Sequence, residues 1–235
     1  MCSRLSYGWL RTTLGNGAVH QMEKGSDTDI GSGLTAVDSV VIRFAGDSGD
    51  GMQLTGARFT SETAVVGNDL ATRPDFPAEI RAPAGSLPGV SSFQIHFGQI
   101  EIHTAGDELD VLVAMNPAAL KVNLGDLKQN GILICNSDAF TEKNLARIAY
   151  DRDPLEDEEL RTRYRVVDVA ITSLTHEALK ELDLAKSAAD KCKNFFALGI
   201  ICWLYNRRIE HTTAWIESKF KDSPNVIAAN KAALH

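Results

Sequence analysis

Residues 40–56 constrain the fold more than any other part of the chain, because they join three structural signals in order. The apolar start of this segment predicts a buried strand. A turn containing Gly46, Gly49 and Gly51 follows and leads into a helical pattern. α/β proteins use such strand–turn–helix units to bring backbone N–H groups and a helix N-terminus to a ligand or partner. The segment predicts an α/β fold in which residues 46–51, the glycine loop, can face a ligand.

Three known motifs come close to the glycine loop, and each fails at a specific position. Gly46 and Gly51 have the spacing of a Walker A loop, but Met52 and Gln53 stand where that loop needs Lys and Ser or Thr. The order G-x-x-G-x-G also differs from the Rossmann order G-x-G-x-x-G. Ser48 could be the nucleophile of a serine hydrolase, but the preceding sequence has no segment that would supply a catalytic His and Asp.

The charges of the glycine loop leave its role open. Asp47 and Asp50 oppose phosphate binding by about 0.3–1 kcal/mol each, which is comparable to the attraction from a helix N-terminus. A structural alternative is that the glycines only permit a tight turn and close packing of the helix on the sheet. Both interpretations agree with the residues.

Composition excludes several classes of function. The 235 residues can bury a sizeable core, and their formal net charge of −7 argues against nucleic acid as a partner. The longest apolar run, residues 195–204, is too short for a membrane span, which takes about 20 residues. We therefore expect neither nucleic-acid binding nor membrane insertion.

The four cysteines are far apart in the sequence and form no C-x-x-C motif: Cys2, Cys135, Cys192 and Cys202. Zinc and iron–sulfur sites need several such ligands at short spacings. We expect no metal site in this chain. Unpaired cysteines in apolar segments are typical of a reducing compartment, so we expect a cytoplasmic protein.

A proline-rich segment follows the first strand–helix unit. Residues 72–89 hold four of the seven prolines, which predicts an extended loop instead of a helix or paired strand. Long loops in compact domains are often functional, although an ordinary connection is the alternative. Residues 91–104 then alternate as a β-hairpin turning at Gly98-Gln99, with His96 opposite Glu101 as a solvated pair.

Further apolar runs predict strands at residues 110–115, 131–136 and 165–171. Capping residues and prolines predict helix starts near Asn116-Pro117, Thr141, Asp153-Pro154 and Thr175. Three further helices are predicted at residues 187–205, 209–220 and 223–235. This alternation predicts a mostly parallel sheet with helices on both faces and one antiparallel hairpin. Ligands of such sheets bind at the carboxyl ends of strands, where the glycine loop and Asn116 should lie.

Four segments in the same order resemble the γ domain of 2-oxoacid:ferredoxin oxidoreductases: residues 46–53 (GDSGDGMQ), 76–85 (FPAEIRAPAG), 114–120 (AMNPAAL) and 193–199 (KNFFALG). The sequence is most similar to the N-terminal part of the 2-oxoglutarate:ferredoxin oxidoreductase α subunit. Residues 1–37 are rich in Gly, Ser, Thr and Asn, which predicts a disordered tail. The resemblance implies a γ domain at 38–222 and, at 223–235, the start of a linker to a further domain.

The resemblance also implies an activity that needs partners. In this family a 2-oxoacid, here expected to be 2-oxoglutarate, is oxidatively decarboxylated to acyl-CoA and CO2 with ferredoxin as electron acceptor. Thiamine diphosphate and a [4Fe-4S] cluster lie on a β subunit, and the remaining α-subunit domain completes the thiamine pocket. We expect this chain to bind none of these cofactors alone and to act only within the complex.

The γ domain of the family is associated with subunit packing and with CoA, and no catalytic residue is expected in it. The resemblance implies that the following residues contact CoA: Gly46, Ser48, Gly49, Gly51, Glu79, Arg81 and Asn116. Arg81 is the candidate anion contact, because guanidinium groups bind phosphate or carboxylate through two hydrogen bonds. The alternative is that Glu79 and Arg81 pair with groups of their own loop.

A stand-alone α/β module that binds CoA or a nucleotide without redox activity is the second functional interpretation. An obligate component of a complex should expose a large apolar face when alone. The helix containing residues 195–204 is the candidate for that face, whereas a self-sufficient module should be monomeric.

Overall fold

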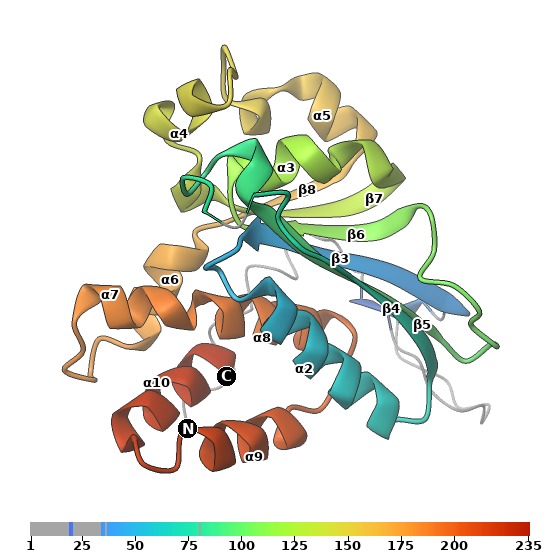
Figure 1. Cartoon of the computed structure of the whole chain (residues 1–235). Helices are drawn as coiled ribbons and strands as arrows, with labels where there is room; N and C mark the ends of the chain where they lie inside the picture. Colours follow the sequence, from blue (N-terminus) through green and yellow to red (C-terminus); the bar gives the residue numbers. More distant parts are fainter. Residues whose placement is uncertain (1–18, 21–33, 36, 80) are drawn as a thin grey trace.

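The computed structural model describes residues 19–20, 34–35, 37–79 and 81–235, and its core is a mixed six-stranded sheet (Figure 1). The strand order is β4-β5-β3-β6-β7-β8. Four strands are parallel to one another: β3 (Ser39–Asp47), β6 (Leu109–Ala114), β7 (Leu127–Asn136) and β8 (Arg165–Val169). β5 (Val90–Gly98) is antiparallel to both of its neighbours, β3 and β4 (Asp69–Asp75). The predicted α/β fold with a mostly parallel sheet is confirmed.

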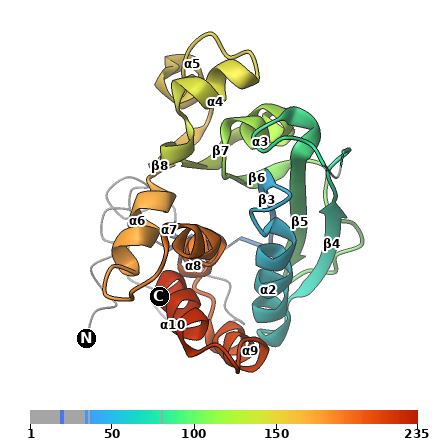
Figure 2. The same ribbon diagram turned by 60° about the vertical axis from the view of Figure 1, so that its left-hand side comes forward.

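Helices cover both faces of the sheet (Figures 1 and 2). One face carries α3 (Pro117–Asn123), α4 (Glu142–Arg147) and α5 (Glu158–Arg163). The other carries α2 (Met52–Val65) and α8 (Lys193–Leu204), and around them lie α6 (Ile171–Ala178), α7 (Lys186–Ala189), α9 (Glu210–Lys219) and α10 (Pro224–Leu234). Short 3₁₀ turns occupy Leu87–Gly89, Leu124–Asp126, Ser137–Ala139, Pro154–Glu156 and Asp190–Cys192.

The central strand β3 contributes to two apolar cores. Ile42 and Phe44 face the core beneath α2 and α8, whereas Val41 and Ala45 face the core beneath α3. A parallel strand buried on both faces has a continuous apolar sequence instead of an alternating one. This double burial explains why the sequence of residues 40–45 already predicted a strand.

The predicted hairpin at residues 91–104 is wrong. β5 ends at Gly98, and residues 99–108 leave the sheet without forming a strand. A side chain at Gly98 would lie 2.5 Å from the carbonyl oxygen of Asp38, so this glycine serves close packing and not a hairpin turn. His96 consequently does not face Glu101, and its Nδ1 lies 2.8 Å from the carbonyl oxygen of Thr104.

The antiparallel partner of β5 precedes it in the chain. Residues 72–75, predicted to be unpaired, belong to β4, where Thr72 pairs with Ile95 and Pro74 with Phe93. Proline is tolerated there because β4 is an edge strand and needs no N–H on its outer side. The loop prediction therefore holds only from residue 76 onward.

The apolar helix is shorter than predicted, and it is buried within this domain. Residues 187–205 do not form one helix, because a 3₁₀ turn at Asp190–Cys192 separates α7 from α8. α8 packs against α2, α6 and α10. Ten of its twelve residues are buried, so the predicted exposed apolar face at residues 195–204 is wrong. The sequence could not show that α10 covers this helix.

Helix boundaries depend on capping residues. The side chain of Asn116 accepts a hydrogen bond of 2.8 Å from the N–H of Ala119, as its position before Pro117 predicted. Thr141 also caps its helix as predicted. In contrast, α5 begins after Asp157 instead of at Asp153, and α6 begins at Ile171, four residues before the predicted start.

Two predicted domain boundaries stay predictions. Residues 1–37, the predicted disordered tail, lie outside the described residues except for residue 37 and the short parallel pair β1 (Val19–His20) and β2 (Leu34–Thr35). Residues 223–235, the predicted start of a linker, include α10, which packs against α8. In the described ranges, no helix is long and apolar enough to span a membrane.

Candidate functional site

The glycine loop folds around the carboxylate of Asp50. Oδ2 of Asp50 accepts a hydrogen bond of 2.9 Å from the N–H of Asp47, and Oδ1 lies 2.8 Å from Nζ of Lys193 at the start of α8. A side chain at Gly46 would lie 2.8 Å from Oδ2 of Asp50. Gly46 is therefore needed so that Asp50 can close the loop.

Gly51 is also required by the fold. It has a φ of +77°, which side chains disfavour, and it stands immediately before α2. A Cβ at this position would lie 2.5 Å from Nδ2 of Asn194. For Gly46 and Gly51, the geometry supports the structural alternative of a tight turn and close helix packing.

Gly49 differs from the other two glycines. In the described part of the chain, no atom outside its immediate neighbours lies within 4 Å of a Cβ built on it, and its φ is not positive. Gly49 and Ser48 are exposed at the tip of the loop. The N–H of Ser48 is not free for a ligand, because it donates to the carbonyl of Gly89 at 3.2 Å.

Asp47 connects the glycine loop to the proline-rich loop. Its Oδ2 accepts a hydrogen bond of 2.8 Å from the N–H of Gly85, and the side chain of Asn116 is a second hydrogen-bonding neighbour of the carboxylate. Burial raises the pKa of Asp47 above its ordinary value, and the negative charge of Asp50 raises it further. The N–H of Gly85, the nearby Asn116 side chain and Lys193 oppose that increase.

A polar cavity of about 190 Å³ lies beside these groups, at the carboxyl ends of β3 and β6. This is the edge of the sheet where the sequence placed the glycine loop and Asn116. The cavity is lined by Asp47, Asp50, Ala84, Gly85, Met115, Asn116, Pro117, Ala139, Asn144, Arg147 and Lys193. We call it the loop cavity.

Glu79 and Arg81 lie outside the loop cavity on the exposed surface of the proline-rich loop. Among the described residues, neither side chain makes a hydrogen bond or an ion pair that would fix it. The loop itself is held by backbone contacts such as Glu79 N–H to Pro88 O at 3.1 Å. Arg147 also donates to the carbonyl of Ala84. The structure thus leaves the Arg81 guanidinium available at the surface.

Five polar residues of the loop cavity were not selected as site residues from the sequence: Asp47 and Asp50 of the glycine loop, Asn144 and Arg147 of α4, and Lys193 of α8. Lys193 lies in one of the four motif segments, so its position there was an available signal. Arg147 sits on a short, charged helix and gave no signal. Tertiary packing brings it to the cavity, where it donates a hydrogen bond to the carbonyl of Ala84.

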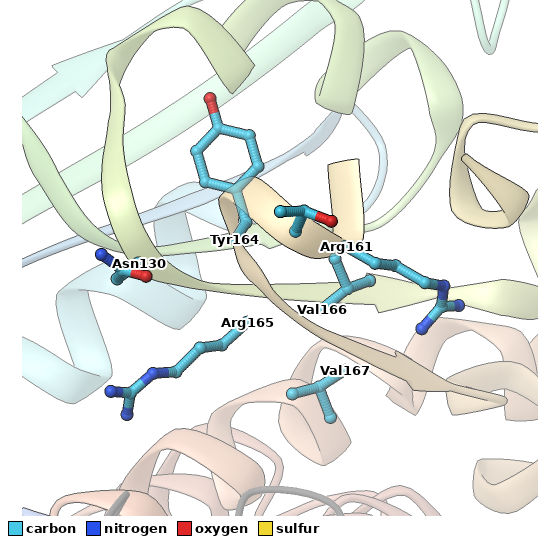
Figure 3. Close-up of a pocket in the computed structure, with 7 residues that line it drawn as sticks. Asn130, Arg161, Tyr164, Arg165, Val166 and Val167 are labelled. Carbon is cyan, nitrogen blue, oxygen red and sulfur yellow. The ribbon is translucent and has the colours of Figure 1, made fainter. Parts of the chain in front are cut away.

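The structure has a second hollow, of about 290 Å³, at the amino end of the edge strand β8 (Figure 3). Val166 and Val167 both line it, and because neighbouring strand residues point to opposite faces, the hollow lies over the strand edge. Arg161 there is already bound to Asp168 and to the carbonyl of Leu155. This hollow contains none of the predicted site residues.

The described cysteines do not fit an iron–sulfur cluster. Cys135, Cys192 and Cys202 are free, buried and located on different elements. Burial raises the pKa of Cys192 to about 11 and also raises the pKa of the other two thiols. In the described ranges, no group of three or more His, Cys, Asp or Glu residues could hold a metal ion.

The fold and the loop cavity define an α/β domain with a polar cavity at the carboxyl edge of its sheet, where the glycine loop meets the proline-rich loop. Residues 41–235 match the model of the pyruvate ferredoxin/flavodoxin oxidoreductase family, and the chain belongs to this family. The resemblance found in the four motif segments is confirmed.

One curated relative is the 2-oxoglutarate oxidoreductase subunit KorA of Mycobacterium tuberculosis. It is 57% identical over 198 residues, which are 84% of this chain and 30% of the relative. The chain therefore spans about a third of the length of the curated relative that it matches.

Solved structures show the same fold at low sequence identity. The 2-oxoglutarate:ferredoxin oxidoreductase of Magnetococcus marinus, with 2-oxoglutarate, coenzyme A and succinyl-CoA bound, has a TM-score of 0.62 at 22% identity. The match covers 84% of this chain and 30% of that one. The oxoacid:ferredoxin oxidoreductase γ subunit of Geobacter sulfurreducens has a TM-score of 0.54 at 18% identity, covering 83% and 96%.

Proposed function

We propose that this chain is a component of a 2-oxoacid:ferredoxin oxidoreductase with 2-oxoglutarate as its substrate. The complex would oxidatively decarboxylate the acid to acyl-CoA and CO2 and pass the electrons to ferredoxin. The observation that carries this proposal is the 57% identity to a 2-oxoglutarate oxidoreductase subunit over 84% of the chain. Function transfers better through such identity than through fold likeness alone.

In the proposed complex, this chain contributes to CoA binding, and its partner subunits carry out the redox chemistry. A β subunit would supply thiamine diphosphate and a [4Fe-4S] cluster, and the remaining α-subunit domain would complete the thiamine pocket. The separate positions of the buried thiols in this chain support this division of labour. Free cysteines also support a reducing, cytoplasmic location for the complex.

We place the CoA contact at the loop cavity and its surroundings. Arg81 is the proposed phosphate contact, because its guanidinium is exposed. Gly49 allows close approach, because it carries no side chain and the fold leaves open space around it. The other proposed residues also have structural roles. Gly46 and Gly51 shape the loop. The N–H of Ser48 donates to the carbonyl of Gly89, and the side chain of Asn116 caps α3. Glu79 stands beside Arg81 on the same loop.

The stand-alone binding module is not favoured. The burial of α8 removes the exposed apolar face that would have separated the two interpretations. The likeness to a subunit of a larger oxidoreductase separates them instead.

Co-purification of the tagged full chain from its own cells tests the proposal. A thiamine- and cluster-bearing subunit should accompany the chain, and 2-oxoglutarate should support CoA-dependent reduction of ferredoxin. Pyruvate is the matched control acid, and faster reduction with pyruvate would correct the proposed substrate. A chain that emerges alone and gains no activity from added β subunit would contradict the proposal.

A further inference from the structure

The two edge strands of the sheet differ in how well they are protected against pairing with another chain. β4 contains Pro74, which has no N–H to donate, and it carries Asp69 and Asp75 at its ends. β8 has no proline, and three of its five residues are valine, which favours strands. Among the described residues, only β7 forms hydrogen bonds with the backbone of β8. The outer N–H and C=O groups of β8 are therefore open to a further strand.

A groove lies beside the amino end of β8. It consists of the hollow of about 290 Å³ described above and an adjoining one of about 430 Å³, and Asn130 and Thr162 line both. The end of α5 forms one side of this groove. The other side is an irregular start of β7, where residues 128–131 bulge opposite the single residue Asp110 of β6. We call this the edge groove.

The side chains of the edge groove do not converge on one point. Figure 3 shows the guanidinium groups of Arg161 and Arg165 pointing away from each other. A small-molecule site needs a few polar groups that meet at one ligand. An added peptide strand instead takes its affinity from backbone hydrogen bonds and its specificity from side-chain contacts at intervals. The geometry of the edge groove suits such a strand.

The edge groove has more unpaired positive than negative charge. Arg161 is neutralised by a carboxylate of β8 itself. In the described part of the chain, Arg165 is exposed and makes no ion pair, and Arg163 only lies over an aromatic ring, at 5.4 Å. Glu159 is the single unpaired carboxylate among the described residues that line the groove. This local excess, in a chain with a formal net charge of −7, favours an acidic partner.

A second copy of this chain would fit the edge groove less well. In an antiparallel pair of β8 strands related by a twofold axis, residues that face each other lie on the same face of the sheet. Arg165 would then face Arg165, Val167 or Val169 of the other copy, and none of these is acidic. A segment of another protein can place a carboxylate opposite Arg165, and cross-strand pairs of opposite charge stabilise a sheet.

We propose that the edge groove binds an extended acidic segment of a partner protein, which pairs with β8 as a further strand of the sheet. The backbone of the segment bonds to the outer N–H and C=O groups of β8, and an Asp or Glu side chain of the segment contacts Arg165. This surface goes beyond the proposed function, because no residue of the loop cavity takes part in it.

Three short peptides test strand pairing and charge separately. The first, acetyl-VTETVTV-amide, alternates valine and threonine around one glutamate. The second has lysine in place of the glutamate. The third has proline in place of the central threonine, which keeps the charge but removes the N–H that a strand needs. Each peptide carries a fluorophore and is titrated into the full chain by anisotropy, and hydrogen exchange of residues 165–169 is measured with and without peptide.

The variant Arg165→Glu reverses the charge that the proposal depends on. Arg208→Glu is the matched control, because Arg208 is also exposed and does not line the edge groove. We expect Arg165→Glu to bind the glutamate peptide roughly three- to tenfold more weakly than the unmodified chain does, and to bind the lysine peptide more tightly. Arg208→Glu should bind both as the unmodified chain does. The N–H groups of β8 should exchange more slowly when the glutamate peptide is bound.

Equal binding of the proline peptide, or binding without protection of residues 165–169, would overturn the inference, because charge alone would then explain the contact. An equal loss in Arg208→Glu, or no binding of the glutamate peptide at millimolar concentration, would also overturn it. A concentration-dependent dimer in sedimentation that protects β8 without any peptide would make a second copy the occupant instead. The proposed function does not depend on these results, because both variants leave the loop cavity unchanged.

Discussion

The glycine loop has three glycines within six residues, and they differ in how much space surrounds them. Gly46 and Gly51 are crowded, whereas Gly49 is not. The first two are surrounded by protein atoms that a side chain would displace, at 2.8 Å and 2.5 Å. Gly49 is surrounded by open space and has no unusual backbone angle. A glycine-rich motif therefore combines residues that shape the loop with a residue that the fold itself does not need. Of the three, only Gly49 is exposed at the tip of the loop.

Gly51→Ala should have the largest effect on stability. A side chain in the left-handed conformation costs about 1–2 kcal/mol, and the contact with Asn194 adds to this. We expect the free energy of unfolding to fall by roughly 2 kcal/mol, measured by urea denaturation. Gly49→Ala is the control in the same loop. An equal loss in both variants would show that the two kinds of glycine do not differ.

Gly46→Ala should cost somewhat less, roughly 1–2 kcal/mol, because its φ is not positive and the atoms that must shift are the Asp50 carboxylate and, by less, the Cβ atoms of Asp50 and Met115. The new methyl group should separate Asp50 from Lys193. Lys193→Met removes the same ion pair from the other side, so the two losses should not add in the double variant. Additive losses in urea denaturation would mean that Gly46 acts independently of this pair.

Gly49→Ala should change the free energy of unfolding by no more than about 0.5 kcal/mol. If CoA approaches the exposed tip as proposed, the added methyl group should raise the KM for CoA several-fold in the assembled complex. The KM for the oxoacid serves as the internal control and should not change. An unchanged KM for CoA would remove Gly49 from the contact surface.

The smallest effects concern pH. Because folding raises the pKa of Asp47, the folded state binds its proton more tightly, and stability falls as pH rises from 3.8 through the folded pKa. Folding lowers the pKa of Asp69, so its contribution is present above 3.8 and is lost as pH falls through its folded pKa. The measurement is the urea midpoint of unfolding across pH. Asp47→Asn should reduce the loss of stability as pH rises above 3.8. Asp69→Asn should reduce the loss of stability as pH falls below 3.8. Identical profiles for both variants would contradict the opposite shifts.

Features set by neighbouring residues could be predicted from the sequence. The strand of residues 40–45, the glycine loop and the Asn116 cap depend on local burial patterns and on hydrogen bonds that span three residues. The edge where the loop cavity lies also followed from the sequence, since the carboxyl ends of parallel strands meet there. These predictions needed no knowledge of how distant segments pack.

Features set by distant packing could not be predicted. Pro74 suggested an unpaired loop, but an edge strand can contain proline, and only the sheet order shows that β4 is at the edge. Arg147 reaches the loop cavity and the carbonyl of Ala84 through tertiary packing, and nothing in its own helix indicates this. The burial of α8 likewise depends on α10, which comes twenty residues later in the chain.

The contact of Asp50 with Lys193 has a consequence for the order of events during synthesis. Lys193 is translated about 140 residues after Asp50. At about 5–20 residues per second, the ribosome needs roughly 7–30 seconds to reach it. Strand β3 and helix α2 can form early, but the glycine loop between them closes only when α8 has been made. The glycine loop is thus completed only after every strand of the six-stranded sheet that supports it has been made.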